Sequence, residues 1–212
     1  MSETFAVARP PAPAGADWVQ VRPWRVQMRK FLIGERLKRA PAERAAEGER
    51  VKLGLRELVD LTAYPVIGIY WPVRGEIDVR DLGLEHLHLG GRVGLPVVVQ
   101  PGAPVEFWSW TEGAPMRRGI WNIPIPEERV VLQPGLLLVP LVGFDAAGYR
   151  LGYGGGYYDR TLAAAAHQRP HCVGLGYADS HLGSIYPQPH DIPMHEIVTA
   201  DAVSSPRAPP SE

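Results

Sequence analysis

The chain has 212 residues, a hydrophobic content of 45% and a formal net charge of −1, which together predict one compact globular domain with a sizeable core. The balanced charge gives no reason to expect a nucleic acid or an anionic membrane as a partner. Cys172 is the one cysteine and no apolar stretch reaches transmembrane or signal-peptide character, so we predict a cytoplasmic protein without an intramolecular disulfide.

Both ends of the chain have the composition of tails. Residues 1–17 are rich in Ala and Pro and lack a periodic apolar pattern, and residues 204–212 repeat that character. We expect both segments to be disordered and the domain to span residues 18–203.

The first predicted helix begins at Pro23, a residue that suits the first turn of a helix. Its apolar residues share one face at helical spacing: Trp24, Met28, Phe31 and Leu32. Three arginines occupy an adjacent stripe: Arg25, Arg29 and Arg36. From spacing alone this stripe is a solvated basic face.

A second helix, predicted at residues 42–61, serves as scaffold, and Pro65 precedes a strand at residues 66–70. The strand leads into a loop that carries Trp71 and Glu76. Ligands of open α/β sheets gather at the carboxyl ends of strands, where Glu76 lies, although a solvated loop charge is the ordinary alternative. Asp78 then resembles the cap of a helix at residues 79–87.

Two further strands are predicted at residues 93–99 and 105–110, the first nearly continuously apolar, as buried parallel strands are. Residues 119–126 follow, too rich in proline for regular structure. Trp121 in this loop could stack on a flat ligand or fold back onto the core, and both readings stay open.

A fourth predicted strand, residues 136–144, passes through a turn at residues 145–148 into a glycine-rich loop. Gly152, Gly154, Gly155 and Gly156 form this loop, and a helix begins at Tyr157. Glycines let a backbone approach a ligand closely, and the free N–H groups of a helix's first turn attract phosphate.

The generic phosphate motifs do not match this loop. A Walker A loop needs a Gly-Lys pair, which the chain lacks, and the dinucleotide fingerprint needs glycine where Tyr157 stands. A glycine-rich turn without a ligand remains possible. However, Arg150 before the loop offers a cation for phosphate and Asp159 after it a hard oxygen for Mg²⁺.

These residues also resemble a known family. The pattern FD-x-x-G-x-RLG-x-G-x-GYYD at residues 144–159 is similar to the signature of 5-formyltetrahydrofolate cyclo-ligase, also called methenyltetrahydrofolate synthetase, and the similarity extends over residues 25–201. Strands alternating with helices predict an α/β fold with a largely parallel sheet. The resemblance implies a single three-layer α/β/α domain, like that of sugar-phosphate isomerases and CoA transferases.

The activity implied by the resemblance is a ligase reaction of one-carbon metabolism. ATP drives the cyclisation of 5-formyltetrahydrofolate to 5,10-methenyltetrahydrofolate, with release of ADP and phosphate and with Mg²⁺ as the metal. Partners would be reduced folate and ATP, with a monomer favoured although the sequence does not fix the oligomeric state. Two alternatives are a non-catalytic folate or nucleotide sensor and an ATP-dependent enzyme for a related formyl or amide substrate.

The resemblance also implies roles for individual residues. The catalytic group is Arg150, Tyr157 and Asp159. ATP would contact Arg25, Arg29, Arg150, Leu151, Gly152, Tyr153, Gly154, Gly155, Gly156, Tyr157 and Tyr158. The folate would contact Trp71, Glu76, Trp121 and Tyr157, with Trp71 equally explained as a packed aromatic. Asp159 and Asp191 would hold the metal, whereas Arg36 has no counterpart of known role.

Three positions depart from the family pattern. Leu141 stands where glycine is usual, Ser180 near a frequent glutamine and His195 in place of a frequent aspartate. None is among the proposed phosphate or metal groups, so any effect would fall on the choice of substrate.

Overall fold

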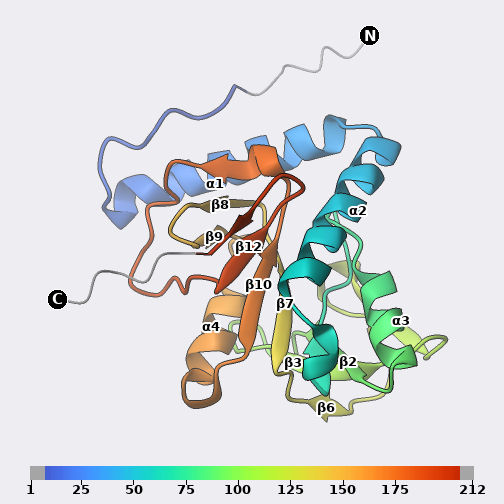
Figure 1. Ribbon diagram of the computed structural model, residues 1–212. Helices are drawn as coiled ribbons and strands as arrows, with labels where there is room; N and C mark the ends of the chain where they lie inside the picture. The colour runs from blue at the N-terminus through green and yellow to red at the C-terminus, as the bar shows by residue number, and fades with distance from the viewer. Residues whose placement is uncertain (1–7, 206–212) are drawn as a thin grey trace, which may run out of the picture.

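The computed structural model describes residues 8–205 and has one central eight-stranded sheet with helices on both faces (Figure 1). The strand order is β13-β12-β10-β7-β1-β2-β3-β6. Four helices are described: α1 (Trp18–Lys38), α2 (Pro41–Leu58), α3 (Arg80–His88) and α4 (Tyr157–Ala164). Single 3₁₀ turns lie at Leu61–Ala63, Ile120–Asn122, Ala166–Gln168 and Ala178–Ser180.

The middle of the sheet is parallel and its edges are antiparallel. The parallel strands are β1 (Val66–Gly68), β2 (Arg92–Val97), β7 (Leu136–Pro140), β10 (His171–Leu175) and β12 (Glu196–Val198). The edge strands are β3 (Glu106–Trp110), β6 (Val131–Leu132) and β13 (Val203–Ser204). The predicted α/β class with a largely parallel sheet is confirmed.

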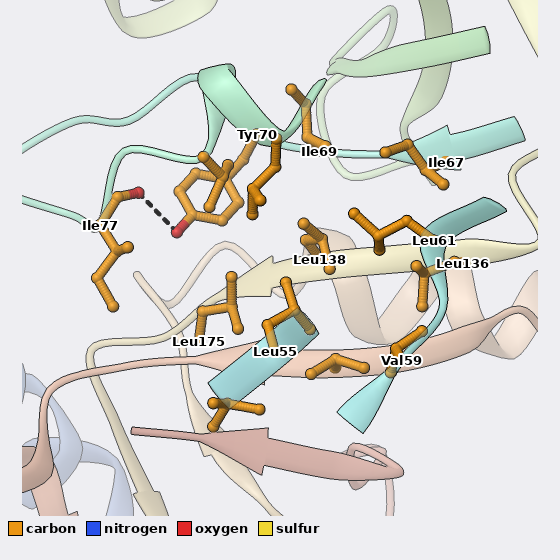
Figure 2. Close-up of a cluster of buried hydrophobic side chains, with 14 of the residues drawn as sticks. Leu55, Val59, Leu61, Ile67, Ile69, Tyr70, Ile77, Leu136, Leu138 and Leu175 are labelled. Carbon is orange, nitrogen blue, oxygen red and sulfur yellow. Dashed lines mark hydrogen bonds between the residues drawn. The ribbon is translucent and has the colours of Figure 1, made fainter. Parts of the chain in front are cut away.

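Side-chain alternation along β7 builds the three layers. Leu136 and Leu138 pack into the cluster that contains residues of α2 and α3, part of which is drawn in Figure 2. Leu137 and Val139 point to the other face, where α4 packs through Leu162. Because successive strand residues face opposite sides, a strand with apolar residues at every position must be covered on both faces.

Two small sheets complete the fold. One contains β8 (Gly143–Asp145), β9 (Arg150–Leu151) and β11 (His181–Leu182). The other pairs β4 (Met116–Arg118) with β5 (Pro124–Pro126). Helix α1 covers the first of these sheets, and its Leu32 packs with Val142 and Leu151. The single strand expected at residues 136–144 was wrong, because the chain leaves the main sheet after Pro140 and pairs again as β8.

The first helix starts five residues earlier than expected. The carboxylate of Asp17 accepts the backbone N–H of Gln20 at 3.1 Å and caps the helix at Trp18. Pro23 therefore lies inside α1, where its missing N–H removes one bond of the helical ladder. The amphipathic face through Trp24, Met28 and Leu32 forms as predicted and is buried.

The expected tails are only partly within the described residues. Residues 1–7 and 206–212 lie outside them, whereas residues 8–17 precede α1 without a helix or strand. Ser204 pairs with Ile197 in β13, so regular structure extends one residue beyond the predicted boundary. Within residues 8–205, no helix is long and apolar enough to cross a bilayer.

Leu141 occupies space that Gly176 leaves open. A Cβ built on Gly176 would lie 2.2 Å from Cδ1 of Leu141 and 3.0 Å from its Cγ, and Leu141 is 1% exposed. Gly176→Ala should therefore lower the free energy of unfolding by about 1–3 kcal/mol, as overpacking does in other cores. Chemical denaturation measures this difference.

Gly34→Ala is the matched control, because a Cβ there meets nothing within 4 Å and lies in the middle of α1. It should leave stability unchanged or raise it slightly. Adding Leu141→Ala to Gly176→Ala removes the clash, so the two destabilisations should sum to more than that of the double variant. Strict additivity would contradict the contact.

Candidate active site

The glycine-rich loop between β9 and α4 lies exposed and has an unusual backbone. Gly154 has a φ of 94° and Gly156 a φ of 64°, values in the left-handed region that side chains rarely adopt. Gly156 is the N-cap of α4, and no side chain caps this helix. The first N–H groups of α4 therefore remain available to an anion bound at the loop.

Arg29 places a positive charge over this loop. Its Nε donates to the Gly152 carbonyl at 2.6 Å, and a Cβ on Gly154 would lie 3.2 Å from its guanidinium carbon. Neither terminal nitrogen of Arg29 donates a hydrogen bond within residues 8–205. Burial and the neighbouring Arg25 lower the pKa of Arg29, yet an arginine stays protonated in proteins. Two nitrogens are thus free to bind phosphate.

Arg150 and Asp159 form a two-pronged ion pair beside the loop. The nitrogens Nη1 and Nη2 of Arg150 lie 3.0 and 3.2 Å from the two carboxylate oxygens of Asp159. The Ile192 N–H also donates to Asp159 Oδ1, at 3.2 Å. The Arg150 side chain is 4% exposed, and its guanidinium lies 5.5 Å from the centre of the Tyr158 ring. Arg150 therefore holds Asp159 in place.

Arg25 holds Asp191 in the same way. Its two terminal nitrogens lie 3.1 and 2.6 Å from the carboxylate oxygens of Asp191, and it also donates to the carbonyls of Ile185 and Tyr186. Burial alone would raise the pKa of Asp191, but the hydrogen bond from Arg25 and that from the Gln188 N–H outweigh it and lower the pKa. Arg25 thus faces protein acceptors, with little left for a phosphate.

The two predicted metal ligands suit Mg²⁺ in chemistry but form no closed cage. Asp159 accepts three hydrogen bonds and Asp191 also accepts three, from four lone-pair sites on each carboxylate. One acceptor site on each remains for a hard cation. No group of three or more metal-binding side chains occurs in the part of the chain that the structure describes. Such a pair fits Mg²⁺, which takes most of its ligands from water and phosphate.

Glu76 lies in the loop after β1, and two buried tyrosines of the core donate hydrogen bonds to carbonyls of this loop. Tyr70 donates to the Ile77 carbonyl at 2.8 Å (Figure 2), and Tyr177 donates to the Gly75 carbonyl at 2.9 Å. Glu76 Oε2 accepts the Val73 N–H at 2.8 Å, whereas its Oε1 is buried without a partner. Burial raises the pKa of Glu76 to about 7, against smaller opposing effects of the Val73 N–H and nearby cations.

The Glu76 loop and the glycine loop meet at Tyr153. The Tyr153 side chain lies near enough to Glu76 to lower the pKa of that carboxyl, although no hydrogen bond joins the two, and burial together with Glu76 raises the pKa of Tyr153. The Arg74 guanidinium lies 5.7 Å from the centre of the Tyr153 ring. The structure therefore brings the carboxylate of Glu76, predicted to contact the folate, next to the glycine-rich loop predicted to bind the nucleotide.

Arg36 joins this region, which sequence reasoning did not anticipate. It is 4% exposed, donates to the Leu141 carbonyl at 2.6 Å and lies near enough to Glu76 to lower its pKa. The available signal was its place in the arginine stripe of Arg25 and Arg29. Spacing alone favours a solvated face for this stripe and the resemblance assigns roles to Arg25 and Arg29 only, but the structure buries Arg25 and Arg36 and all three arginines contact carbonyls of distant loops.

The predicted aromatic folate contacts fall in two places. Trp121 is 65% exposed and forms an edge-to-face pair with Tyr157, with ring centres 5.5 Å apart. Trp71 forms an edge-to-face pair with Trp110, at 6.4 Å, and Arg80 covers it. Trp71 lines a cleft of about 750 Å³ with Glu76 and Tyr177. The structure thus joins Trp71 to Glu76, and Trp121 to Tyr157.

Two of the departures from the family pattern have local explanations. Ser180 is buried and donates to the Tyr177 carbonyl at 2.6 Å. His195 accepts the Cys172 N–H at 2.9 Å and packs edge-on against His171, at the amino ends of β10 and β12. His195 therefore lies at the amino ends of the parallel strands, opposite the carboxyl ends where the candidate site lies.

Comparisons with known proteins agree with this geometry. A model of the 5-formyltetrahydrofolate cyclo-ligase family matches residues 21–200. The 5-formyltetrahydrofolate cyclo-ligase of Mycolicibacterium smegmatis is 31% identical over 187 residues, covering 82% of this chain and 92% of that protein. The cyclo-ligase of Escherichia coli K12 is 28% identical over 167 residues, covering 73% of this chain and 92% of its own.

Solved structures show the same relationship. The solution structure of Aquifex aeolicus 5,10-methenyltetrahydrofolate synthetase superposes with a TM-score of 0.74 at 28% identity, covering 89% of this chain and 95% of that one. A synthetase from Mycoplasma pneumoniae, at 24% identity and a TM-score of 0.64, shares the fold.

Proposed function

Since the chain belongs to the 5-formyltetrahydrofolate cyclo-ligase family, we propose that it converts 5-formyltetrahydrofolate and ATP to 5,10-methenyltetrahydrofolate, ADP and phosphate. The observation that carries the proposal is the meeting of two kinds of site. An anion-receptive glycine loop under Arg29 lies beside Glu76, whose Oε1 is buried and has no partner within residues 8–205. The substrates, ATP and a reduced folate, are small molecules of the cytoplasm, and every proposed group comes from a single chain.

The triphosphate would lie on the glycine loop. Residues 151–158 would offer backbone N–H groups, and Arg29 would donate its two free nitrogens to phosphate oxygens. Arg25 and Arg150 would act through the carboxylates that they hold, Asp191 and Asp159. Each ion pair fixes the direction of a carboxylate before the nucleotide arrives, which lowers the entropy lost on binding.

Asp159 and Asp191 would hold Mg²⁺ by their remaining acceptor sites. When bound, the ion would neutralise charge on the phosphate oxygens. The chain's own contribution is to present these two carboxylates while Arg29 balances the rest of the phosphate charge.

The substrate would supply both nucleophiles. The formyl oxygen attacks the γ-phosphoryl group, and the bond to the β-phosphate oxygen breaks to release ADP. The folate N10 then attacks the formyl carbon, the carbon–oxygen bond breaks with phosphate as the leaving group, and the N10 proton passes to solvent. Phosphorylation is required because hydroxide leaves poorly. The protein therefore needs position and charge more than a nucleophile of its own.

The folate would bind between the glycine loop and the strand ends. Glu76 Oε1 would accept an N–H of the pterin ring, since it is the buried acceptor without a partner. Tyr157 and the exposed Trp121 would contact the flat rings of the substrate, and Trp71 would line the entrance on the Glu76 side.

One assay tests the whole proposal. The protein is incubated with ATP, Mg²⁺ and 5-formyltetrahydrofolate, and the absorbance of methenyltetrahydrofolate is followed together with ADP. We expect both products to form in equal amounts. ATP binding without an absorbance change would instead indicate a sensor, and ADP release with another formyl or amide compound would indicate a related enzyme.

A further inference from the structure

Three polar side-chain atoms near Glu76 are buried without a hydrogen-bond partner in the part of the chain that the structure describes. They are Glu76 Oε1, Arg36 Nη1 and Tyr158 Oη. Tyr158 lies near Glu76, which raises the pKa of Tyr158 beyond the effect of burial. Buried polar groups are nearly always paired with protein, water or a ligand, so these atoms mark a place where a polar ligand could form hydrogen bonds.

Two contacts fix the guanidinium of Arg36, and one of its terminal nitrogens has no acceptor within residues 8–205. Its Nη2 donates to the Leu141 carbonyl at 2.6 Å, and its guanidinium lies 5.4 Å from the centre of the Tyr177 ring. Tyr177 lines the same cleft as Glu76, and its hydroxyl donates a hydrogen bond to the Gly75 carbonyl in the loop that carries Glu76. The fixed guanidinium thus keeps one nitrogen, Nη1, without an acceptor.

Arg36 and Glu76 do not satisfy each other. Arg36 is close enough to favour the ionised form of Glu76, yet no hydrogen bond joins the two side chains and both keep a free buried atom. A ligand that bridges them must donate to a carboxylate and accept from a guanidinium. The pyrimidinone edge of a pterin does both, since its N–H groups stand next to its 4-oxo oxygen.

Resting on the proposed function, we propose that Arg36 Nη1 donates to the 4-oxo oxygen of the pterin while Glu76 Oε1 accepts an N–H of the same edge. Arg36 is then a specificity residue. It selects an oxo group over an amino group at this position, because a guanidinium only donates and an amino group offers no good acceptor.

The test compares two ligands that differ at one position. We measure by calorimetry the binding of 5-formyltetrahydrofolate and of its 4-amino-4-deoxy analogue, without nucleotide. Wild-type protein should prefer the oxo compound by about 100-fold or more. Arg36→Gln should weaken binding of the oxo compound about 10- to 100-fold and bring the preference close to one, because a glutamine amide can pair with either group.

Arg36→Lys separates charge from shape. A lysine keeps the cation but has a single point of donation, so binding of the oxo compound should weaken while the preference over the amino compound persists. This variant also keeps the proposal testable if Arg36→Gln unfolds. Thermal unfolding of each variant, followed by circular dichroism, shows which proteins are folded.

Arg39→Gln is the matched control. Arg39 also covers the Tyr177 ring, at 5.1 Å, but its terminal nitrogens pair with Glu47 and Asp179. This variant should keep the wild-type preference for the oxo compound. If Arg39→Gln lost the preference for the oxo compound as Arg36→Gln does, the effect would come from the arginines packing on the Tyr177 ring, and the proposal would be wrong.

The remaining outcomes are distinct. Wild-type turnover with unchanged oxo preference in Arg36→Gln would overturn the role of Arg36 and leave the proposed function intact. A wild-type protein that binds neither compound would overturn both. Equal weakening of both ligands in Arg36→Gln would assign Arg36 to the shape of the loop and would contradict the hydrogen bond.

Discussion

Asp159→Asn should lower kcat by about 100-fold or more, because it removes a charge that positions the transferred phosphoryl group in the proposed site. The same change should also destabilise the fold. The Arg150 side chain is 4% exposed and has Asp159 as its ion-pair partner, so an asparagine leaves a buried cation without an opposite charge. Breaking one half of a buried pair costs about 3 kcal/mol or more.

The measurement must keep these two effects apart. Turnover is assayed at a temperature where circular dichroism shows the variant folded, and ATP affinity is measured with and without Mg²⁺. Wild-type protein should bind ATP more tightly with Mg²⁺, and Asp159→Asn should lose most of that gain. Wild-type kcat in a folded Asp159→Asn protein would rule out the metal role.

Glu196→Gln is a suitable control for the loss of an ion pair. Glu196 Oε2 lies 2.5 Å from His171 Nε2. The pair is at the amino end of β12, at the opposite end of the parallel strands from the glycine loop. It should change stability but leave kcat and the Mg²⁺ dependence of ATP binding as in wild type. If both variants lost activity alike, the loss would follow from destabilisation.

The sequence predicts the layers of this protein well because their signal is local. The apolar run that begins at Leu136 shows a strand buried on both faces, and the spacing of Trp24, Met28 and Leu32 shows one helix face. These periods depend on neighbouring residues alone. The end of β7 had no such signal, because Leu141 and Val142 are as apolar as the strand before them.

Partners distant in sequence decide the details of the site. Arg25 and Asp191 stand 166 positions apart, and Arg36 and the Leu141 carbonyl 105. No periodicity links such pairs, so spacing alone favours a solvated face for the arginine stripe, and only the family resemblance indicates roles for Arg25 and Arg29. The structure shows Arg25 and Arg36 buried, and it divides the arginines into those that hold carboxylates and those with free nitrogens. That division separates residues that position other groups from residues available to a ligand.

Glu76→Gln should stabilise the protein at neutral and alkaline pH while it weakens folate binding. The pKa of Glu76 is raised from 4.5 to about 7, first by burial. A group with a raised folded pKa binds its proton more tightly in the folded state, so its contribution to stability is full below pH 4.5 and is lost as pH rises to about 7. A shift of that size corresponds to about 3 kcal/mol.

The difference between variant and wild type isolates this effect. Glutamine resembles the protonated acid, so the two proteins should have similar free energies of unfolding below pH 4.5. The variant should become more stable by up to about 3 kcal/mol at pH 8. Urea unfolding at intervals of pH measures the difference. Glu85→Gln is the control, because Glu85 on α3 forms an exposed ion pair with Arg56 of α2. Exposed pairs contribute little, so this variant should change the free energy of unfolding by about 1 kcal/mol or less.

Function explains why a carboxylate stays at a position where it destabilises the fold. Glu76 Oε1 is buried without a partner, and in the proposed complex a pterin N–H would supply that partner. Glu76→Gln should therefore raise the Kd for 5-formyltetrahydrofolate about 10- to 100-fold, opposite in sign to its effect on stability. If the variant bound folate as tightly as wild type, or if its stability followed that of wild type at every pH, Glu76 would not be an acceptor kept free for the substrate. Folate binding to the wild type should also lower the pKa of Glu76 toward its usual value, because a hydrogen bond stabilises the ionised form. The destabilisation caused by the unpaired charge should then be smaller in the complex.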